Sequence, residues 1–221
     1  LFFYFIFYLS KIKLLYNIKS ITHRRNKPMT KFLKILLILS FASLVCFAQT
    51  RQGSTNQTGT NSAQTKPNST TKNIVELNQR GAGKKIGTVT VTETADGISI
   101  EVKASGLTQK AGQVGFHLHE KNSPEPTTDA KGNLVVGGGL GGHWDPDNTQ
   151  KHAGPDGDGH RGDLDALTIN DDGSINQVVI SAKIKYGDVK GRSFVIHANP
   201  DNYTDEPANG GSGARLYTAI F

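Results

Sequence analysis

Apolar and polar residues alternate with a period of two over most of the chain from residue 72 to the C-terminus. Such alternation is typical of strands with one buried face, and capped helical windows are absent from this region of the sequence. We expect strands at residues 73–78, 86–93, 98–105, 113–120, 166–170, 175–184, 193–198 and 215–221. The pattern predicts an all-β domain, either a sandwich or a flattened barrel.

Two Asp-Gly dipeptides indicate tight turns between consecutive strands. Asp96-Gly97 lies between the second and third predicted strands, and Asp172-Gly173 lies between the fifth and sixth. This dipeptide accepts the positive φ angles of tight hairpins. We therefore expect a β-hairpin at each position.

Two long segments, residues 121–164 and 199–214, interrupt the strands. Compact domains rarely contain loops of this length unless the loops carry a function or an internal staple. The single cysteine of the chain, Cys46, precedes the domain, so a disulfide inside the domain is excluded. A bound metal is the obvious candidate for the staple.

The segment 29–48 has the layout of a secretory signal peptide. Two lysines are followed by an apolar run and then by small residues ending at Ala48. The apolar run is shorter than the roughly 20 residues that span a bilayer. Cleavage after Ala48 removes Cys46; the alternative is a lipoprotein acylated at Cys46, although Val45 stands where a small residue is expected. Residues 1–28 are interpreted as an over-extended reading frame.

The basic charge of the chain is concentrated in the predicted leader. Residues 1–48 hold eight basic residues and no acidic one, leaving 17 basic against 19 acidic residues in the remainder. This balance gives no support to nucleic-acid binding. Residues 49–71 are rich in Ser, Thr, Asn and Gln and predict a flexible tether, either a spacer or a secreted tail without function. Residues 72–221 then form one domain in a periplasmic, cell-envelope or secreted protein.

Six of the seven histidines lie between residues 117 and 197. His117 and His119 are two apart on a predicted strand, so both project from one face while Phe116 and Leu118 face the other. Taken alone, this pair is weak evidence for a metal site and is more typical of two surface histidines. A Gly- and Pro-rich loop then supplies three imidazoles and one carboxylate, a four-ligand set suited to structural Zn²⁺: His143, His152, His160 and Asp163.

His197, at the end of an apolar strand, is by itself typical of a hydrogen-bonded core histidine. Combined with His117, His119 and one loop histidine, it completes four nitrogens, a set that suits copper.

Several motifs together resemble secreted bacterial copper/zinc superoxide dismutases over about residues 72–221. They are GFHLHE, GGHWDP, the loop ending HRGDL, VIHANPDNYTDEP and GGSGARL. The resemblance implies a Greek-key flattened β-barrel with a metal-binding loop and an electrostatic loop. It implies dismutation of superoxide to O₂ and H₂O₂, with Cu and Zn as cofactors.

The resemblance also assigns roles to individual residues. It implies copper on His117, His119, His143 and His197, and zinc on His143, His152, His160 and Asp163. His143 then bridges the metals as an imidazolate and takes part in proton transfer. Asp201 matches a carboxylate that hydrogen-bonds one copper-ligand and one zinc-ligand histidine, and Arg215 matches a guanidinium that attracts and orients superoxide beside the copper.

The chain departs from this family at its disulfide. Pro124 and Thr218 stand where the family has its two cysteines, and Trp144 stands where Tyr or Phe is usual. The main alternative is a non-catalytic extracytoplasmic copper/zinc-binding protein on the same fold, and a structural β-domain is a third reading. Oligomeric state is left open, including a homodimer, and membrane contact is expected only if Cys46 is lipidated.

Overall fold

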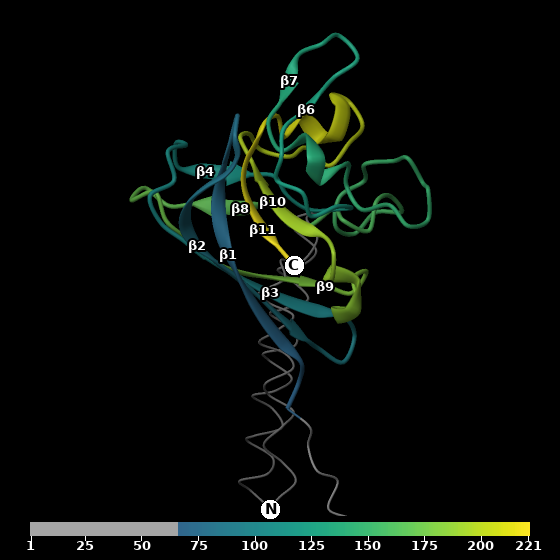
Figure 1. Cartoon of the computed structure of the whole chain (residues 1–221). Coiled ribbons are helices and arrows are strands. Elements are labelled where there is room, and N and C mark those ends of the chain that lie inside the picture. The colour runs from purple at the N-terminus through teal and green to yellow at the C-terminus, as the bar shows by residue number, and fades with distance from the viewer. Residues whose placement is uncertain (1–65) are drawn as a thin grey trace, which may run out of the picture. The chain divides into compact units, whose positions relative to one another are not determined.

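The computed structural model describes residues 66–221 and shows an almost entirely β-structured domain (Figure 1). The strands are β1 Ser69–Asn78, β2 Gly81–Glu93, β3 Ile98–Ala104, β4 Gly112–Val114, β5 Phe116–His119, β6 Thr127–Thr128, β7 Leu134–Val135, β8 Leu167–Ile169, β9 Ile175–Ser181, β10 Ser193–His197 and β11 Arg215–Ile220. Helical turns among these residues are the 3₁₀ segments η1 Gly138–Leu140, η2 Tyr186–Val189 and η3 Ala208–Gly211. Within the described residues, no helix has the length and apolarity needed to cross a membrane.

Seven strands form one curled antiparallel sheet in the order β5-β10-β11-β1-β2-β3-β9. The short strands β4 and β8 pair separately, as do β6 and β7. The order is not sequential, as expected for Greek-key connections, and the flattened-barrel prediction is confirmed. The segments around β6 and β7 and the stretch near residue 210 gather at one end of the sheet (Figure 1).

The predicted alternation appears directly in the burial of the strands. In β3, Ile98, Ile100 and Val102 are fully buried while the residues between them are partly exposed. These side chains join one apolar core with residues of the other main strands, including Phe116, Phe194 and Ile196. The two strands β5 and β10 differ because every residue in them is buried. Their second face must therefore be covered by something other than the core.

Four strand predictions need correction. The second strand begins at Gly81 rather than at residue 86. The first strand begins at Ser69, inside the stretch predicted as tether, because Ser69 and Thr71 pair with β2 through hydroxyl contacts of 3.0 and 2.9 Å to Thr92 and Thr90. The predicted strand 113–120 is divided between β4 and β5. At the division, the Gly115 N–H donates to the Asn199 carbonyl, and its own carbonyl accepts from His197. The predicted strand 175–184 ends at Ser181.

Of the two predicted hairpins, the structure forms the one between β2 and β3. Strands β8 and β9 are joined by a tight turn at Asp172-Gly173, but they pair with β4 and β3 and not with each other, so the second hairpin prediction is wrong. The Asp-Gly pair of the β2–β3 turn also acts differently from the expectation. Gly173 adopts a φ of 73°, as a tight turn requires. Neither Asp96 nor Gly97 has positive φ. Glycine is required at position 97 for space, because a Cβ there would lie 2.1 Å from the Ser181 carbonyl oxygen.

Candidate metal centre

The predicted ligands lie on the face of β5 and β10 that is turned away from the main core. Phe116 and Leu118 of β5 enter the core, so the alternation of the strand places His117 and His119 on the opposite face. The two long loops, residues 121–164 and 199–214, cover that face. This explains why both strands are buried throughout.

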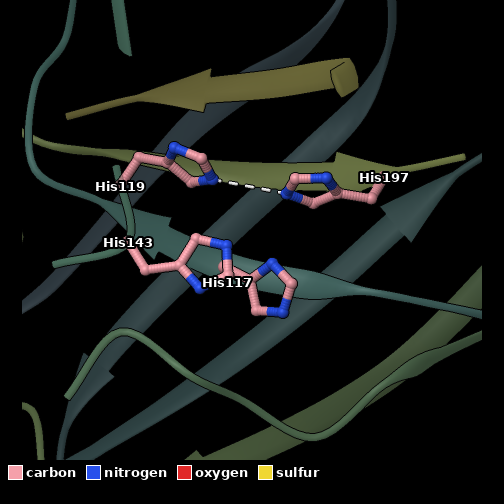
Figure 2. Close-up of side chains that lie close together, drawn as sticks. All are labelled: His117, His119, His143 and His197. Atoms are coloured by element: carbon pink, nitrogen blue, oxygen red, sulfur yellow. Dashed lines mark hydrogen bonds between the residues drawn. The ribbon is translucent and has the colours of Figure 1, made fainter. Parts of the chain in front are cut away.

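Four histidines form a cluster that we call the copper set. His117 and His119 come from β5, His197 ends β10, and His143 comes from the first long loop. One ring nitrogen from each lies within 4.8 Å of the others. Figure 2 shows the four rings gathered around a common region. The register, which pairs Val195 with His117 and Ser193 with His119, sets the relative position of the strand-borne rings.

The partners of His119 and His197 define which ring nitrogen carries hydrogen. His119 Nδ1 lies 2.9 Å from the Gly141 carbonyl oxygen and His197 Nδ1 lies 3.1 Å from that of Gly213. A carbonyl only accepts, so both Nδ1 atoms donate. Burial lowers the pKa of both rings well below the usual range, so they are neutral. The two Nε2 atoms, 3.3 Å apart and joined by the dashed line in Figure 2, therefore present lone pairs to each other, an arrangement that a cation stabilises.

The remaining two rings of the copper set each offer a buried nitrogen. His117 Nε2 donates to Asp201 Oδ2 at 2.6 Å, which leaves His117 Nδ1 without a hydrogen-bond partner. His143 Nε2 is also buried and unpartnered. Burial lowers the pKa of His117, and it lowers that of His143 to about 4, so both rings are in the neutral form that binds metals. Buried nitrogens are normally hydrogen-bonded, so these two point to a ligand.

A second cluster, which we call the zinc set, consists of His143, His152, His160 and Asp163, whose ligand atoms also lie within 4.8 Å of one another. Asp163 Oδ1 lies 3.0 Å from His143 Nδ1, 3.0 Å from His152 Nδ1 and 3.3 Å from His160 Nδ1. The His152 contact lacks hydrogen-bond geometry. One carboxylate oxygen facing three imidazole nitrogens is the donor set of a closed tetrahedral zinc site.

A close backbone approach brings Asp163 to this position. Gly162 accepts from the Leu118 N–H of β5 and donates to the Trp144 carbonyl, each at 2.9 Å. A Cβ on Gly162 would lie 2.2 Å from the Leu118 oxygen, so only glycine allows the loop to run along the strand. The next residue, Asp163, consequently forms a backbone bridge with His117.

Asp201 connects the two sets. Its Oδ2 accepts from His117 of the copper set, and its Oδ1 lies 2.8 Å from His152 Nε2 of the zinc set. Burial by itself raises the pKa of the Asp201 carboxyl. The contacts with His117 and His152 have the larger, opposite effect, so the pKa lies below its usual value. For His152, burial by itself lowers the pKa. The contacts with Asp163 and Asp201 outweigh burial and raise this pKa to about 9. Two carboxylates thus favour positive charge around His152.

Arg215 stands at the start of β11 beside the copper set. Its guanidinium donates to the carbonyl oxygens of Gly137 at 3.1 Å and Gly141 at 2.8 Å. Gly141 O also faces His119 Nδ1, so the cation and a copper-set histidine share one acceptor. A cavity of about 500 Å³ is lined by Arg215 together with His119, His143 and His197. His152, His160 and Asp163 do not line it, so the cavity reaches three of the four copper-set rings and, of the zinc set, only the shared His143.

The structure brings together every site residue predicted from the sequence, and it adds partners that the sequence did not indicate. The carbonyls of Gly141 and Gly213 orient two copper-set rings. Asp205 accepts from the His152 N–H at 2.7 Å. Backbone carbonyls carry no sequence signal, and Asp205 is one of several acids in its loop. At the position of the missing disulfide, Thr218 is buried and its hydroxyl donates to Phe194 O at 3.0 Å.

The chemistry of the donors fits copper and zinc. The copper set offers four imidazole nitrogens, of which those of His117 and His143 are buried and unpartnered. Such a set suits copper, whereas three nitrogens and one carboxylate oxygen suit zinc. His143 belongs to both sets, with Nδ1 facing Asp163 and Nε2 free of protein partners.

Comparison with known proteins points in the same direction. A family model described as copper/zinc superoxide dismutase (SODC) matches residues 85–221, which include all the site residues. The Cu-Zn superoxide dismutase of Brucella abortus biovar 1 (strain 9-941) is 42% identical over 154 residues, covering 69% of this chain and 87% of the relative. That of Escherichia coli (strain K12) is 40% identical over 147 residues, covering 65% and 83%.

Solved structures show the same similarity. The Cu/Zn superoxide dismutase from Brucella abortus has a TM-score of 0.66 at 39% identity and covers 69% of this chain and 99% of its own. A protein from Bacillus subtilis described as SOD-like has a TM-score of 0.51 at 29% identity and covers 69% and 100%.

Proposed function

The chain belongs to the copper/zinc superoxide dismutase family, and on this premise we propose that it converts two superoxide anions and two protons into O₂ and H₂O₂ at the paired metal sets. One observation carries the proposal. Two complete ligand sets share His143, and three histidines of the copper set line a cavity together with Arg215. A protein that only stored metal has no need of a substrate cavity with a fixed cation beside one of its sites.

Each metal has a distinct place and task. Copper would be held by the copper set and zinc by the zinc set. Copper supplies one-electron redox chemistry when bound, and zinc, which has none, supplies charge and structure.

Arg215 is placed to attract and orient the substrate. A guanidinium remains protonated at any working pH, so it attracts a small anion without giving up a proton. Two of its N–H groups are held by the carbonyls of Gly137 and Gly141, which immobilise the cation at the cavity wall. Because His119 donates to the same Gly141 oxygen, the guanidinium is held at a fixed position relative to the copper set.

His143 is placed to handle a proton. Formation of H₂O₂ requires two protons; His143 is among the residues that line the cavity, and its buried Nε2 has no hydrogen-bond partner in the protein. A proton could therefore be held and released at Nε2 whenever copper does not occupy this nitrogen. On the other side of the ring, the contact of Nδ1 with Asp163 fixes the ring orientation during this exchange.

The proposal is tested by measuring activity, copper and zinc on the same sample of the purified domain. Dismutation should rise in proportion to copper content and be absent from metal-free protein. A sample with one copper and one zinc per chain but no dismutation would favour the alternative, a non-catalytic copper/zinc-binding protein.

Export from the cytoplasm is a separate part of the proposal. Its support is the signal-peptide pattern of residues 29–48, which lie outside the described residues. Cell fractionation and the mass of the mature chain test it, with cleavage after Ala48 expected. A Cys46→Ser variant is the control, since it should change the distribution only if Cys46 is lipidated. A full-length chain in the cytoplasm would contradict export.

A further inference from the structure

Lys183 follows strand β9 and reaches the segment that carries most of the zinc set, residues 151–163, which we call the zinc loop. Its ammonium nitrogen donates to three backbone carbonyl oxygens: Gly154 at 3.0 Å, Gly157 at 3.3 Å and His160 at 3.2 Å. An ammonium group has three N–H donors, so each can be matched by an acceptor. The side chain is half-buried against the loop rather than extended into solvent.

The zinc loop depends on such contacts because it has little regular structure. Between η1, which ends at Leu140, and β8, which begins at Leu167, the described residues form no further strand or helix. Within the loop, Gly154 O and His160 O accept only long backbone bonds, of 3.4 Å from Gly157 and 3.3 Å from Asp163. Lys183 provides a closer contact to both carbonyls and ties them to the end of a strand of the main sheet.

The three carbonyls lie where they control the zinc ligands. All three follow His152 in the chain, and the last belongs to His160 itself, three residues before Asp163. Holding them restricts the backbone between His152 and His160 before any metal arrives. Restricting a loop in its bound conformation raises affinity because less conformational entropy is lost on binding.

A neighbouring lysine offers a natural comparison. Lys185 lies two residues further on, is exposed, and donates to a single carbonyl, that of Asp96 in the β2–β3 turn, at 2.8 Å. It has no contact with the zinc loop among the hydrogen bonds of the described residues. The two lysines thus share charge and location at the end of β9, but only Lys183 contacts the zinc loop.

We propose that Lys183 is a positioning residue for zinc: its ammonium group clamps the carbonyls of Gly154, Gly157 and His160 and so pre-arranges His160 and Asp163 for the metal. The inference rests on the proposed zinc assignment. It also gives the protein, which lacks the family's disulfide, a polar tie between the metal-bearing loop and the sheet.

The charge of Lys183 makes the sign of the expected effect informative. Removing the positive charge of Lys183 would, by electrostatics alone, strengthen the binding of Zn²⁺ at the zinc set. A loss of zinc affinity in Lys183→Met therefore reports lost positioning, because the electrostatic change acts in the opposite direction.

The test compares the mature wild-type protein with Lys183→Met, Lys183→Arg and the control Lys185→Met. Zinc affinity is measured by chelator competition after one equivalent of Cu²⁺ has filled the copper set. Lys183→Met should bind zinc about 10- to 100-fold more weakly, the usual effect of losing a group that orients metal ligands. Lys183→Arg should recover much of the affinity, and Lys185→Met should match wild type.

Two further readouts separate positioning from general stability. The melting temperature of the zinc-free form should fall no more in Lys183→Met than in Lys185→Met, whereas the increase caused by zinc should be smaller. The visible absorption of Co²⁺ at the zinc set should change in Lys183→Met and be restored in Lys183→Arg. If Lys183→Met fails to fold, Lys183→Gln, which keeps a shorter neutral donor, serves in the same measurements.

Equal zinc affinity in wild type and Lys183→Met would overturn the clamp, as would equal losses of melting temperature with and without zinc. If wild type itself binds no zinc at this set, the zinc assignment of the proposed function fails independently of Lys183.

Discussion

The copper set and the zinc set differ in what holds them. Three of the four copper-set histidines stand on β5 and β10, whose paired register determines their separation. All four members of the zinc set come from the first long loop, residues 121–164. A strand ladder resists distortion without metal, whereas a loop is held by individual side-chain contacts. We therefore expect the copper set to persist in the metal-free protein and the zinc set, which is held there by individual contacts such as those of Lys183, to be less well ordered until metal binds.

The largest effect is expected from His119→Ala, which separates the two sets most cleanly. His119 contributes to the copper set alone, and its other nitrogen contacts only the Gly141 carbonyl. Dismutation should fall by more than about 100-fold, beyond the effect of losing an orienting partner, while zinc content stays at one per chain. Metal analysis and activity on one sample check this. Near-full activity at stoichiometric copper would exclude His119 as a copper ligand.

Zinc removal should destabilise the protein more than any thiol reductant. With free zinc about 1,000-fold above its Kd, binding contributes about 4 kcal/mol, or about 8–16 °C in melting temperature for a domain of this size. A reductant has no internal disulfide to cut because the chain contains one cysteine. Thermal unfolding of copper-free protein, with zinc content verified after reductant treatment, distinguishes the two. A large effect of reductant at constant zinc would contradict the absence of a disulfide.

The same comparison explains how far the sequence could predict this structure. The common face of His117 and His119 was predictable, because alternation with a period of two assigns each strand residue to a face. His197 ends a continuous apolar run, so it became a ligand candidate only in combination with the other histidines and through the family resemblance. The loop residues His152, His160 and Asp163 were recognised as ligands by type and spacing and by a family resemblance. Their arrangement was not predictable, because it depends on backbone carbonyls and on the close approach of Gly162, which have no pattern in the sequence. The role of Gly97 was misjudged for the same reason.

Asp201→Asn should show how strongly the two sets are coupled. The substitution keeps the shape of the side chain but removes the charge and one acceptor from the contacts with His117 and His152. Zinc affinity should fall about 10- to 100-fold, as for other groups that orient a metal ligand. Copper affinity should fall less, because His117 is held by its strand. Chelator competition for each metal measures both values, and a larger loss for copper than for zinc would show that the strand does not protect the copper set.

Arg215 links a strand to the first long loop. It starts strand β11, and its guanidinium donates to the loop carbonyls of Gly137 and Gly141. Substitutions should separate its charge from its hydrogen bonds. Arg215→Lys keeps the charge but loses the planar fork, so we expect a rate lower by about threefold and a salt dependence of unchanged sign. Arg215→Glu reverses the local field, so we expect a rate lower by about tenfold that rises with ionic strength, because salt screens the repulsion between the new carboxylate and superoxide. Stopped-flow rates across a range of salt concentrations, at equal copper content, measure both effects. Identical salt slopes for wild type, Arg215→Lys and Arg215→Glu would show that Arg215 holds the loop without steering the substrate.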